Sequence, residues 1–251
     1  MLAEGTYNTS IDRPPPSEDF SFPIALTSSQ TKRDRSKTPM TRIIIFANGE
    51  LPDRDKARAL IHQQDYMLCA DGGTRHALAL GLKPDLVIGD MDSAARDELQ
   101  RLKESDVPLE LFPHDKNETD LELAILRAVE MNPEKILIVA ALGGRLDQTL
   151  ANIALLADPR LLPFDVQLDD GVEQVLLCRD QVQIDGRRGD LVSLVPWQGP
   201  VSEVETENLK WPLRRETLYP DKTRGISNEM TEDTASISIG SGSLLVVHRR
   251  V

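Results

Sequence analysis

The sequence has few aromatic residues, few cysteines and no long apolar stretch. Aromatic residues make up only 4% of the 251 residues, so we expect Leu, Ile, Val and Ala to build the core. No apolar run approaches the roughly 20 residues of a membrane-spanning helix. The first residues, M-L-A-E-G-T-Y-N-T-S, lack the basic start and apolar core of a signal peptide. We therefore expect a cytoplasmic protein with no membrane partner.

An excess of basic residues is also absent. The formal net charge is −12 and the isoelectric point is about 4.8. Proteins that bind duplex nucleic acid normally carry a basic surface, so nucleic acid is not an expected partner. A substrate that is itself anionic would need local Arg or Lys residues, or a metal ion, to neutralise its charge.

The two cysteines, Cys69 and Cys178, lie far apart in the sequence, and each sits in a short apolar run. Buried apolar surroundings are typical of reduced core thiols in a reducing compartment. A disulfide between the two residues remains an alternative at this point, because sequence separation does not exclude one.

Three segments differ in composition. Residues 1–40 contain Pro14-Pro15-Pro16 and a mixture of small, polar and charged residues, which is typical of a flexible N-terminal extension. Alternating apolar residues at 20–26 leave open a short strand or docking segment. The remainder divides near Gly171 into an α/β domain at 41–170 and a β domain at 171–251.

Apolar runs alternate with amphipathic segments between residues 41 and 170. This alternation predicts a mainly parallel sheet with helices on both faces. Strands are expected at 42–47, 66–70, 86–88, 109–112, 136–141 and 165–168. Helices are expected at 53–64, 74–80, 94–103, 119–131 and 146–157.

After Gly171 the apolar runs become short, and Gly, Pro and Asp separate them without helical stretches. That pattern predicts a small all-β sandwich. The expected strands are at 175–177, 182–184, 191–195, 201–204, 235–239 and 244–248.

Four aspartates follow expected strand ends or begin an expected helix. They are Asp71, Asp90, Asp92 and Asp120. Ligands bind at the carboxyl edge of open parallel sheets, so we expect all four at one edge. Clustered carboxylates repel one another unless a cation lies between them, and hard oxygen ligands favour Mg²⁺ or Ca²⁺ over Zn²⁺. Together these aspartates predict a metal-phosphate site, although each acidic turn alone is typical of an ordinary turn.

Other residues near this edge suit phosphate groups. Glycines allow close backbone approach, and cationic side chains neutralise charge. Ser93 and Thr119 also fit as plain helix caps. The sequence contains no G-x-x-x-x-G-K-[ST] pattern and no serine or cysteine nucleophile motif, which argues against a P-loop enzyme and against covalent catalysis. The glycines and cations are Gly72, Gly73, Arg75, Lys116 and Arg145.

Six motifs in order resemble the thiamine pyrophosphokinase family. The resemblance extends from about residue 42 to residue 251 and leaves out the N-terminal extension. The motifs are C-A-D-G-G at 69–73, P-D-L-V-I-G-D-M-D-S at 84–93, E-T-D at 118–120, G-G-R-L-D-Q-T-L-A-N at 143–152, L-K-W-P-L at 209–213 and G-I-S-N-E at 225–229.

The resemblance implies an α/β ATP-binding domain followed by a thiamine-binding β-sandwich, in a homodimer whose active site is shared between subunits. It implies transfer of a pyrophosphoryl group from ATP to the hydroxyl of thiamine, giving thiamine diphosphate and AMP. The catalytic and Mg²⁺-binding residues would be Asp71, Asp90, Asp92 and Asp120. The ATP-phosphate residues would be Gly72, Gly73, Arg75, Ser93, Lys116, Thr119 and Arg145. The thiamine-binding residues would be Trp211, which would stack on the substrate, with Ser227 and Asn228.

Three positions depart from the family pattern. Arg75 stands where many members have Asn, Lys116 where animal enzymes have Gln, and Gln148 where bacterial members often have His. None of these removes a carboxylate. Two alternatives remain open from the sequence: a pyrophosphokinase for another hydroxymethyl heterocycle such as a pterin, and a nucleotide- or thiamine-binding module without turnover.

Overall fold

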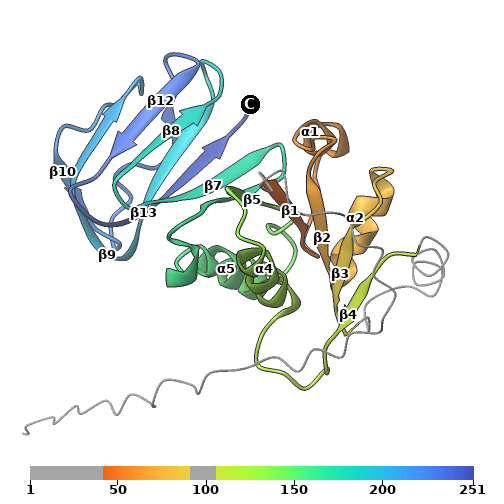
Figure 1. Cartoon of the computed structure of the whole chain (residues 1–251). Helices are drawn as coiled ribbons and strands as arrows, with labels where there is room; N and C mark the ends of the chain where they lie inside the picture. Colours follow the sequence, from red (N-terminus) through yellow and green to blue (C-terminus); the bar gives the residue numbers. More distant parts are fainter. Residues whose placement is uncertain (1–41, 91–105) are drawn as a thin grey trace, which may run out of the picture. The chain divides into compact units, whose positions relative to one another are not determined.

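Six parallel strands form the N-terminal part of the protein. The computed structural model describes residues 42–90 and 106–251, and these strands run in the order β4-β3-β2-β1-β5-β6 (Figure 1). Parallel pairing confirms the sheet type expected from the alternating pattern. Their bounds are β1 Arg42–Phe46, β2 Tyr66–Ala70, β3 Leu86–Gly89, β4 Leu109–Leu111, β5 Lys135–Val139 and β6 Asp165–Asp169.

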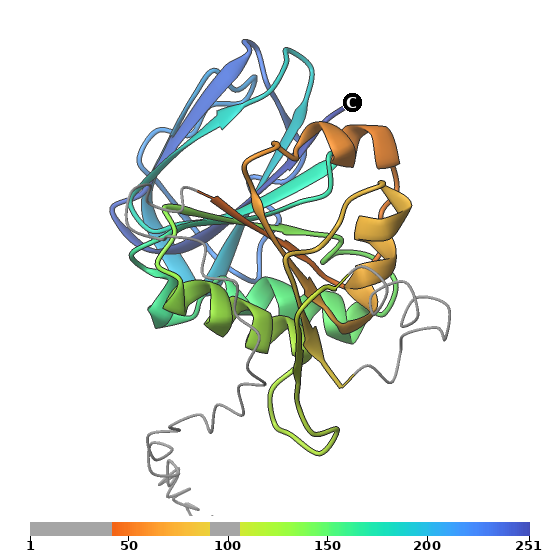
Figure 2. The same ribbon diagram turned by 45° about the vertical axis from the view of Figure 1, so that its right-hand side comes forward.

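Helices cover both faces of this sheet, because successive side chains of each strand point to opposite faces. Ile43 and Ile45 of β1 pack in the same cluster as the apolar side of α4. Ile44 and Phe46 pack on the other face, in a cluster with Ala77 of α2 and with Leu60 and Ile61, which directly follow α1. Figure 2 shows α4 and α5 on one side of the strands and α1 and α2 on the other. The helices are α1 Arg54–Ala59, α2 Thr74–Ala79, α4 Asp120–Glu130 and α5 Leu146–Leu155.

The strand order reverses between β1 and β5. The chain builds outward from β1 to β4, returns through α4 to β5 on the other side of β1, and continues to β6. The loops that follow β1 and β5 are joined by backbone hydrogen bonds from Gly49 to Ala140 and from Glu50 to Leu142. Such a reversal point opens a crevice outside the carboxyl ends of the strands.

The C-terminal part is β-rich, and β6 joins it to the parallel sheet by pairing antiparallel with β7. Strand β9 has 17 residues; its first part pairs with β13 and its last part with β12. The sheet thereby folds into two layers, which enclose a core that includes Leu194 and Ile237. The strands are β7 Glu173–Cys178, β8 Gln181–Asp185, β9 Leu191–Glu207, β10 Glu216–Leu218, β11 Asn228–Glu229, β12 Thr234–Ser238 and β13 Ser241–Arg249.

Several boundaries differ from the sequence-based predictions. The expected strands at 191–195 and 201–204 are parts of the single strand β9, because Pro196 and Gly199 interrupt its apolar pattern without ending it. The short strands β10 and β11 have no apolar run and were not expected. The helix expected at 53–64 ends at Ala59. The helix expected at 94–103 lies outside the described residues, as does the whole N-terminal extension at 1–40.

Both cysteines are buried and free, as expected for core thiols. Burial raises the pKa of Cys178 to about 11, which keeps this thiol protonated near neutral pH. None of the helices in the described ranges is long and apolar enough to cross a membrane.

A buried polar network lies near the C-terminal end of the chain. His248 is fully buried; one ring nitrogen lies 2.9 Å from Asp190 Oδ2 and the other 3.2 Å from Gln174 Oε1. The Asp190 carboxylate also accepts hydrogen bonds from the backbone N–H groups of Arg187 and Val251. Burial opposes the charged form, but these hydrogen bonds outweigh it, so the pKa of Asp190 lies below its ordinary value of 3.8.

We predict that the Asp190 carboxylate makes the free energy of unfolding change with pH in the acidic range. Because the folded-state pKa is lowered, the stabilisation is complete above pH 3.8 and is lost as the pH falls through the lower folded-state value. Urea unfolding at a series of pH values should show a stability difference between the wild type and Asp190→Asn that shrinks below about pH 4. A difference that stayed constant down to pH 2.5 would contradict this assignment.

Candidate active site

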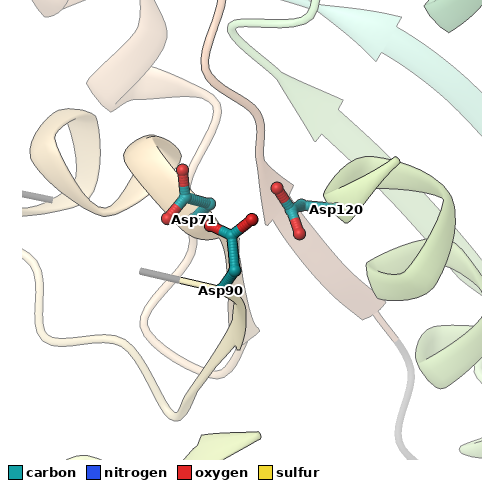
Figure 3. Close-up of side chains that lie close together, drawn as sticks. All are labelled: Asp71, Asp90 and Asp120. Atoms are coloured by element: carbon teal, nitrogen blue, oxygen red, sulfur yellow. The ribbon is translucent and has the colours of Figure 1, made fainter. Parts of the chain in front are cut away.

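Three carboxylates from three separate elements lie close together at the carboxyl edge of the parallel sheet. Asp71 follows β2, Asp90 follows β3, and Asp120 begins α4 (Figure 3). One oxygen of each carboxylate lies within 4.8 Å of an oxygen of both others. The structure thus brings together three of the four aspartates that the sequence predicted, while Asp92 lies outside the described residues.

The local backbone places Asp71 in a constrained position. Asp71 is 4% exposed and has a φ of 41°, in the left-handed region that residues other than glycine rarely adopt. Gly89, at the end of β3, packs against it: a Cβ atom added to Gly89 would lie 2.8 Å from the Cβ of Asp71 and 3.3 Å from Asp120 Oδ1. Gly89 therefore allows β3 to approach closely enough for the carboxylates to meet.

Lys116 forms ion pairs with two of the three carboxylates. Its Nζ atom lies 2.9 Å from Asp120 Oδ1 and 3.7 Å from Asp90 Oδ2. Burial lowers the pKa of Lys116, but its hydrogen bond with Asp120 and the nearby carboxylates outweigh that effect and raise it. Burial raises the pKa of Asp120, as do Asp71 and Asp90, and Lys116 only partly compensates.

The net charge of the three carboxylates and Lys116 is negative, which favours binding of a further cation. Three carboxylates and one ammonium leave two uncompensated negative charges when all are ionised. Asp71 Oδ1 is buried and has no hydrogen-bond partner among the described residues. A buried carboxylate oxygen without a partner is costly, and oxygen-only ligands suit a hard divalent cation. The residues present therefore fit a Mg²⁺ site.

The two glycines after Asp71 pack against the end of β1 and the loop that follows it. A Cβ atom on Gly73 would lie 2.0 Å from the carbonyl oxygen of Phe46, and one on Gly72 would lie 2.5 Å from Asn48 Nδ2. Arg75 extends from α2 to the same loop, where its guanidinium donates to the carbonyl oxygens of Asn48 and Gly49. The structure thus gives both glycines a packing role in addition to the phosphate role expected from the sequence.

The turn after β5 is held by the helix that follows it. Thr149 and Asn152 of α5 donate side-chain hydrogen bonds to the carbonyl oxygens of Gly143 and Ala141. Arg145, at the start of this helix, is exposed and pairs with Asp147. No residue of α5 is buried; Leu146 is 73% exposed and Leu150 51%. This helix therefore presents an uncovered apolar side.

A pocket lies in the β-rich part. It has a volume of about 310 Å³, with the half-exposed indole of Trp211 at its wall. Ser227 has a φ of 55°, and its backbone N–H donates to Ser193 Oγ. The pocket is lined by Trp211, Leu213, Thr223, Arg224, Gly225, Ile226, Ser227 and Asn228.

Comparison with known protein families agrees with both halves of this arrangement. Residues 57–168 match the family model described as "Thiamin pyrophosphokinase, catalytic domain", and residues 179–244 match "Thiamin pyrophosphokinase, vitamin B1 binding domain". The chain is 30% identical to thiamine pyrophosphokinase 1 of Arabidopsis thaliana, over 85% of this chain and 88% of that protein. The chain belongs to the thiamine pyrophosphokinase family.

Two bacterial relatives extend the comparison. Thiamine pyrophosphokinase of Bacillus subtilis is 28% identical over 70% of this chain and 84% of its own length. The crystal structure of thiamine pyrophosphokinase from Bacillus subtilis superposes with a TM-score of 0.76 at 25% identity and covers 84% of this chain and 99% of that one. A thiamin pyrophosphokinase family protein from Enterococcus faecalis gives a TM-score of 0.71 at 26% identity, over 84% of this chain and all of that one. The α/β fold with a β-rich C-terminal part is therefore the fold of this family.

The remaining residues predicted for the thiamine pyrophosphokinase site make different kinds of contact in the structure. Lys116 contacts the carboxylates directly, whereas Thr119 uses its hydroxyl to cap α4 by accepting from the backbone N–H of Glu122. Ser93 lies outside the described residues. Trp211, Ser227 and Asn228 all line the pocket in the β-rich part. The side chain of Asn228 also forms hydrogen bonds with the backbone of Trp211.

Four residues of these sites were not expected from the sequence: Gly89, Thr149, Asn152 and Arg224. The first three lie inside the family motifs at 84–93 and 143–152, so their position in a motif was a sequence signal that could have identified them. Arg224 lines the pocket and forms a two-point ion pair with Glu216. Nothing in the sequence pattern around Arg224 indicates that pairing, because Glu216 begins the short strand β10, which the sequence did not predict, and Arg224 lies in the loop that follows it.

We predict that Gly89→Ala lowers catalytic turnover by about tenfold or more, because the added methyl group displaces Asp71 and Asp120. Gly81→Ala is the matched control: Gly81 also has a positive φ, of 70°, but its Cβ atom would meet nothing within 4 Å. The control should lose about 1 kcal/mol of stability and keep its turnover. Steady-state kinetics with urea unfolding separates the effects, and equal turnover in the two variants would contradict the steric role of Gly89.

Proposed function

We propose that the enzyme transfers the pyrophosphoryl group of ATP to the hydroxyl of thiamine and releases AMP. The observation that carries this proposal is the meeting of Asp71, Asp90 and Asp120 at the carboxyl edge of the sheet, in a chain whose C-terminal part matches a vitamin B1 binding domain. The same match disfavours a pterin substrate, and the carboxylate group disfavours a binding module without turnover.

In this proposal the three carboxylates hold Mg²⁺. Bound Mg²⁺ would neutralise the charge of the phosphate oxygens and so lower the barrier to nucleophilic attack at phosphorus. Lys116 donates to phosphate oxygens beside the carboxylates, while Arg75 acts from α2 and Arg145 from the turn before α5. Gly72, Gly73 and Thr119 complete the nucleotide side through their backbone N–H groups.

The thiamine side of the proposal is the pocket beside Trp211. Thiamine combines a cationic ring with a flat aromatic ring, and the face of an indole attracts both. The oxygen of the thiamine hydroxyl forms a bond to the β-phosphorus as the bond from the β-phosphorus to the bridging oxygen of AMP breaks, and the hydroxyl proton is released. Such transfer depends on positioning and charge neutralisation and needs no covalent enzyme intermediate.

We propose the domain division 41–170 for ATP and 171–251 for thiamine, joined by the β6–β7 pair. We also propose a homodimer in which the ATP part of one copy faces the thiamine pocket of the other. The uncovered apolar side of α5, which begins beside the turn after β5, supports an interface there. The free buried cysteines support a cytoplasmic location.

The reaction is tested by incubating the purified protein with ATP, Mg²⁺ and thiamine and resolving the products. We predict equal amounts of AMP and thiamine diphosphate. Asp71→Asn should lower turnover about a hundredfold or more, because a metal ligand is lost while Asn still tolerates the positive φ. Formation of ADP with thiamine monophosphate would contradict the proposed transfer.

A control substitution shows whether loss of any carboxylate charge, and not of a metal ligand, lowers turnover. Asp165→Asn removes an exposed carboxylate at the start of β6, where Asp165 pairs with Lys135 at the opposite edge of the sheet. Its turnover should remain within about twofold of the wild type, since surface ion pairs contribute little. Equal losses in the two variants would remove the support for the metal site.

For the dimer, we predict that Leu150→Glu dissociates the two copies and lowers specific activity at low protein concentration, because burying a carboxylate against apolar surface is costly. Sedimentation velocity measures the oligomeric state. Leu162→Glu is the control, because Leu162 is also exposed but lies outside α5. A wild type that sediments as a monomer, or a variant that remains dimeric, contradicts this interface.

A further inference from the structure

Asn228 uses its side chain to hold the backbone of Trp211. Asn228 Oδ1 accepts hydrogen bonds from the N–H groups of Trp211, at 3.0 Å, and Glu229, at 2.9 Å. Asn228 Nδ2 donates to the carbonyl oxygen of Trp211 at 2.7 Å. The amide orientation is determined by these partners, since the flipped form would place NH₂ against two N–H groups and oxygen against oxygen. Asn228 is only 4% exposed.

These bonds replace backbone pairing that ends at this point. Leu209 and Met230 form an isolated β-bridge, and the N–H of Lys210 donates to the carbonyl oxygen of Glu229. Pairing cannot continue past Trp211, because Pro212 has no N–H group and Ser227 turns the opposite segment away with its positive φ. The carboxamide of Asn228 supplies the two hydrogen bonds that a neighbouring strand would otherwise give Trp211.

The same short segment also restrains the indole ring. Lys210 Nζ lies 5.1 Å from the ring centroid and forms a 2.8 Å ion pair with Glu229, the neighbour of Asn228. Lys210 itself is not among the residues that line the pocket. A half-exposed indole without such restraints would lose conformational freedom when a substrate stacked on it.

We propose that Asn228 is a positioning residue for substrate recognition: it preorganises Trp211 at the wall of the pocket and does not itself contact the acceptor. This differs from the direct thiamine contact expected for Asn228 from the sequence. The inference rests on the proposed function, in which Trp211 stacks on thiamine. Preorganisation increases affinity by reducing the entropy lost on binding, so its removal should affect acceptor binding selectively.

The test is Asn228→Asp, which keeps the two acceptor interactions but faces the Trp211 carbonyl oxygen with an oxygen that cannot donate. We expect KM for thiamine to rise about tenfold, with kcat and KM for ATP within about twofold of the wild type. A merely structural role would lower the fraction of active enzyme, and hence kcat, without changing KM for thiamine. That result would overturn the proposal.

A double-mutant cycle separates positioning from direct contact. Trp211→Ala should raise KM for thiamine about tenfold to a hundredfold, as loss of ring stacking does. In the Trp211→Ala background, Asn228→Asp should then add less than about twofold, because its effect passes through the indole. Fully additive effects would show that Asn228 contacts the substrate and would overturn the positioning role.

Asn208→Asp is the matched control. Asn208 lies just before the same segment, and its Nδ2 donates to the carbonyl oxygen of Thr234 at 3.0 Å, outside the pocket. The same chemical change there should leave KM for thiamine unchanged. An equal rise in both variants would assign the effect to added negative charge and overturn the proposal.

The outcomes distinguish this inference from the function on which it rests. If Trp211→Ala leaves KM for thiamine unchanged, the thiamine pocket is misplaced and both fail. If Trp211→Ala raises KM but Asn228→Asp does not, only the positioning role fails. Should Asn228→Asp not fold, Asn228→Ala takes its place in the cycle; failure of both to fold would make Asn228 a residue required for folding and overturn the proposal.

Discussion

The mutual repulsion of three carboxylates is the constraint on which the ATP-side site depends. Asp71, Asp90 and Asp120 are held within 4.8 Å of one another although each is negatively charged when ionised. The sheet imposes this approach, because parallel strands end at one edge and Gly89 removes the side chain that would keep them apart. Lys116 offsets only part of the charge. Under the proposed function, this arrangement is a preorganised binding place for a divalent cation and for the phosphates of ATP.

The proposed ATP site and the proposed thiamine site rely on different physical interactions. On the ATP side, strand ends and loops at the reversal between β1 and β5 supply charge and close backbone approach. On the thiamine side, a folded-over β structure supplies an aromatic wall whose position is set by hydrogen bonds. Phosphate requires neutralisation and orientation, whereas a flat cation requires a surface. This difference explains why the family combines an α/β part with a β-rich part.

Much of the fold was predictable because the residue pattern of buried strands is strong. The β-branched run at Ile43-Ile44-Ile45 and the stripe of α4 gave elements that the structure confirms to within about two residues. Strands β10 and β11 were not predictable, since they have two or three residues and owe their conformation to pairing with β9. The length of β9 was not predictable either, because the strand continues through Pro196 and Gly199 even though its register with β13 shifts between Trp197 and Ser202.

Residue types and their order along the chain determined the family, the parallel sheet and the aspartates that follow its strands. These features depend on local chemistry: apolar runs, glycine turns and acidic residues at strand ends. Only the tertiary structure decided which residues meet. It placed Lys116 between two carboxylates, gave Gly72 and Gly73 a packing role against β1, and directed the side chain of Asn228 to the backbone of Trp211. Such contacts join residues from different loops, and their distances depend on how the strands and loops pack.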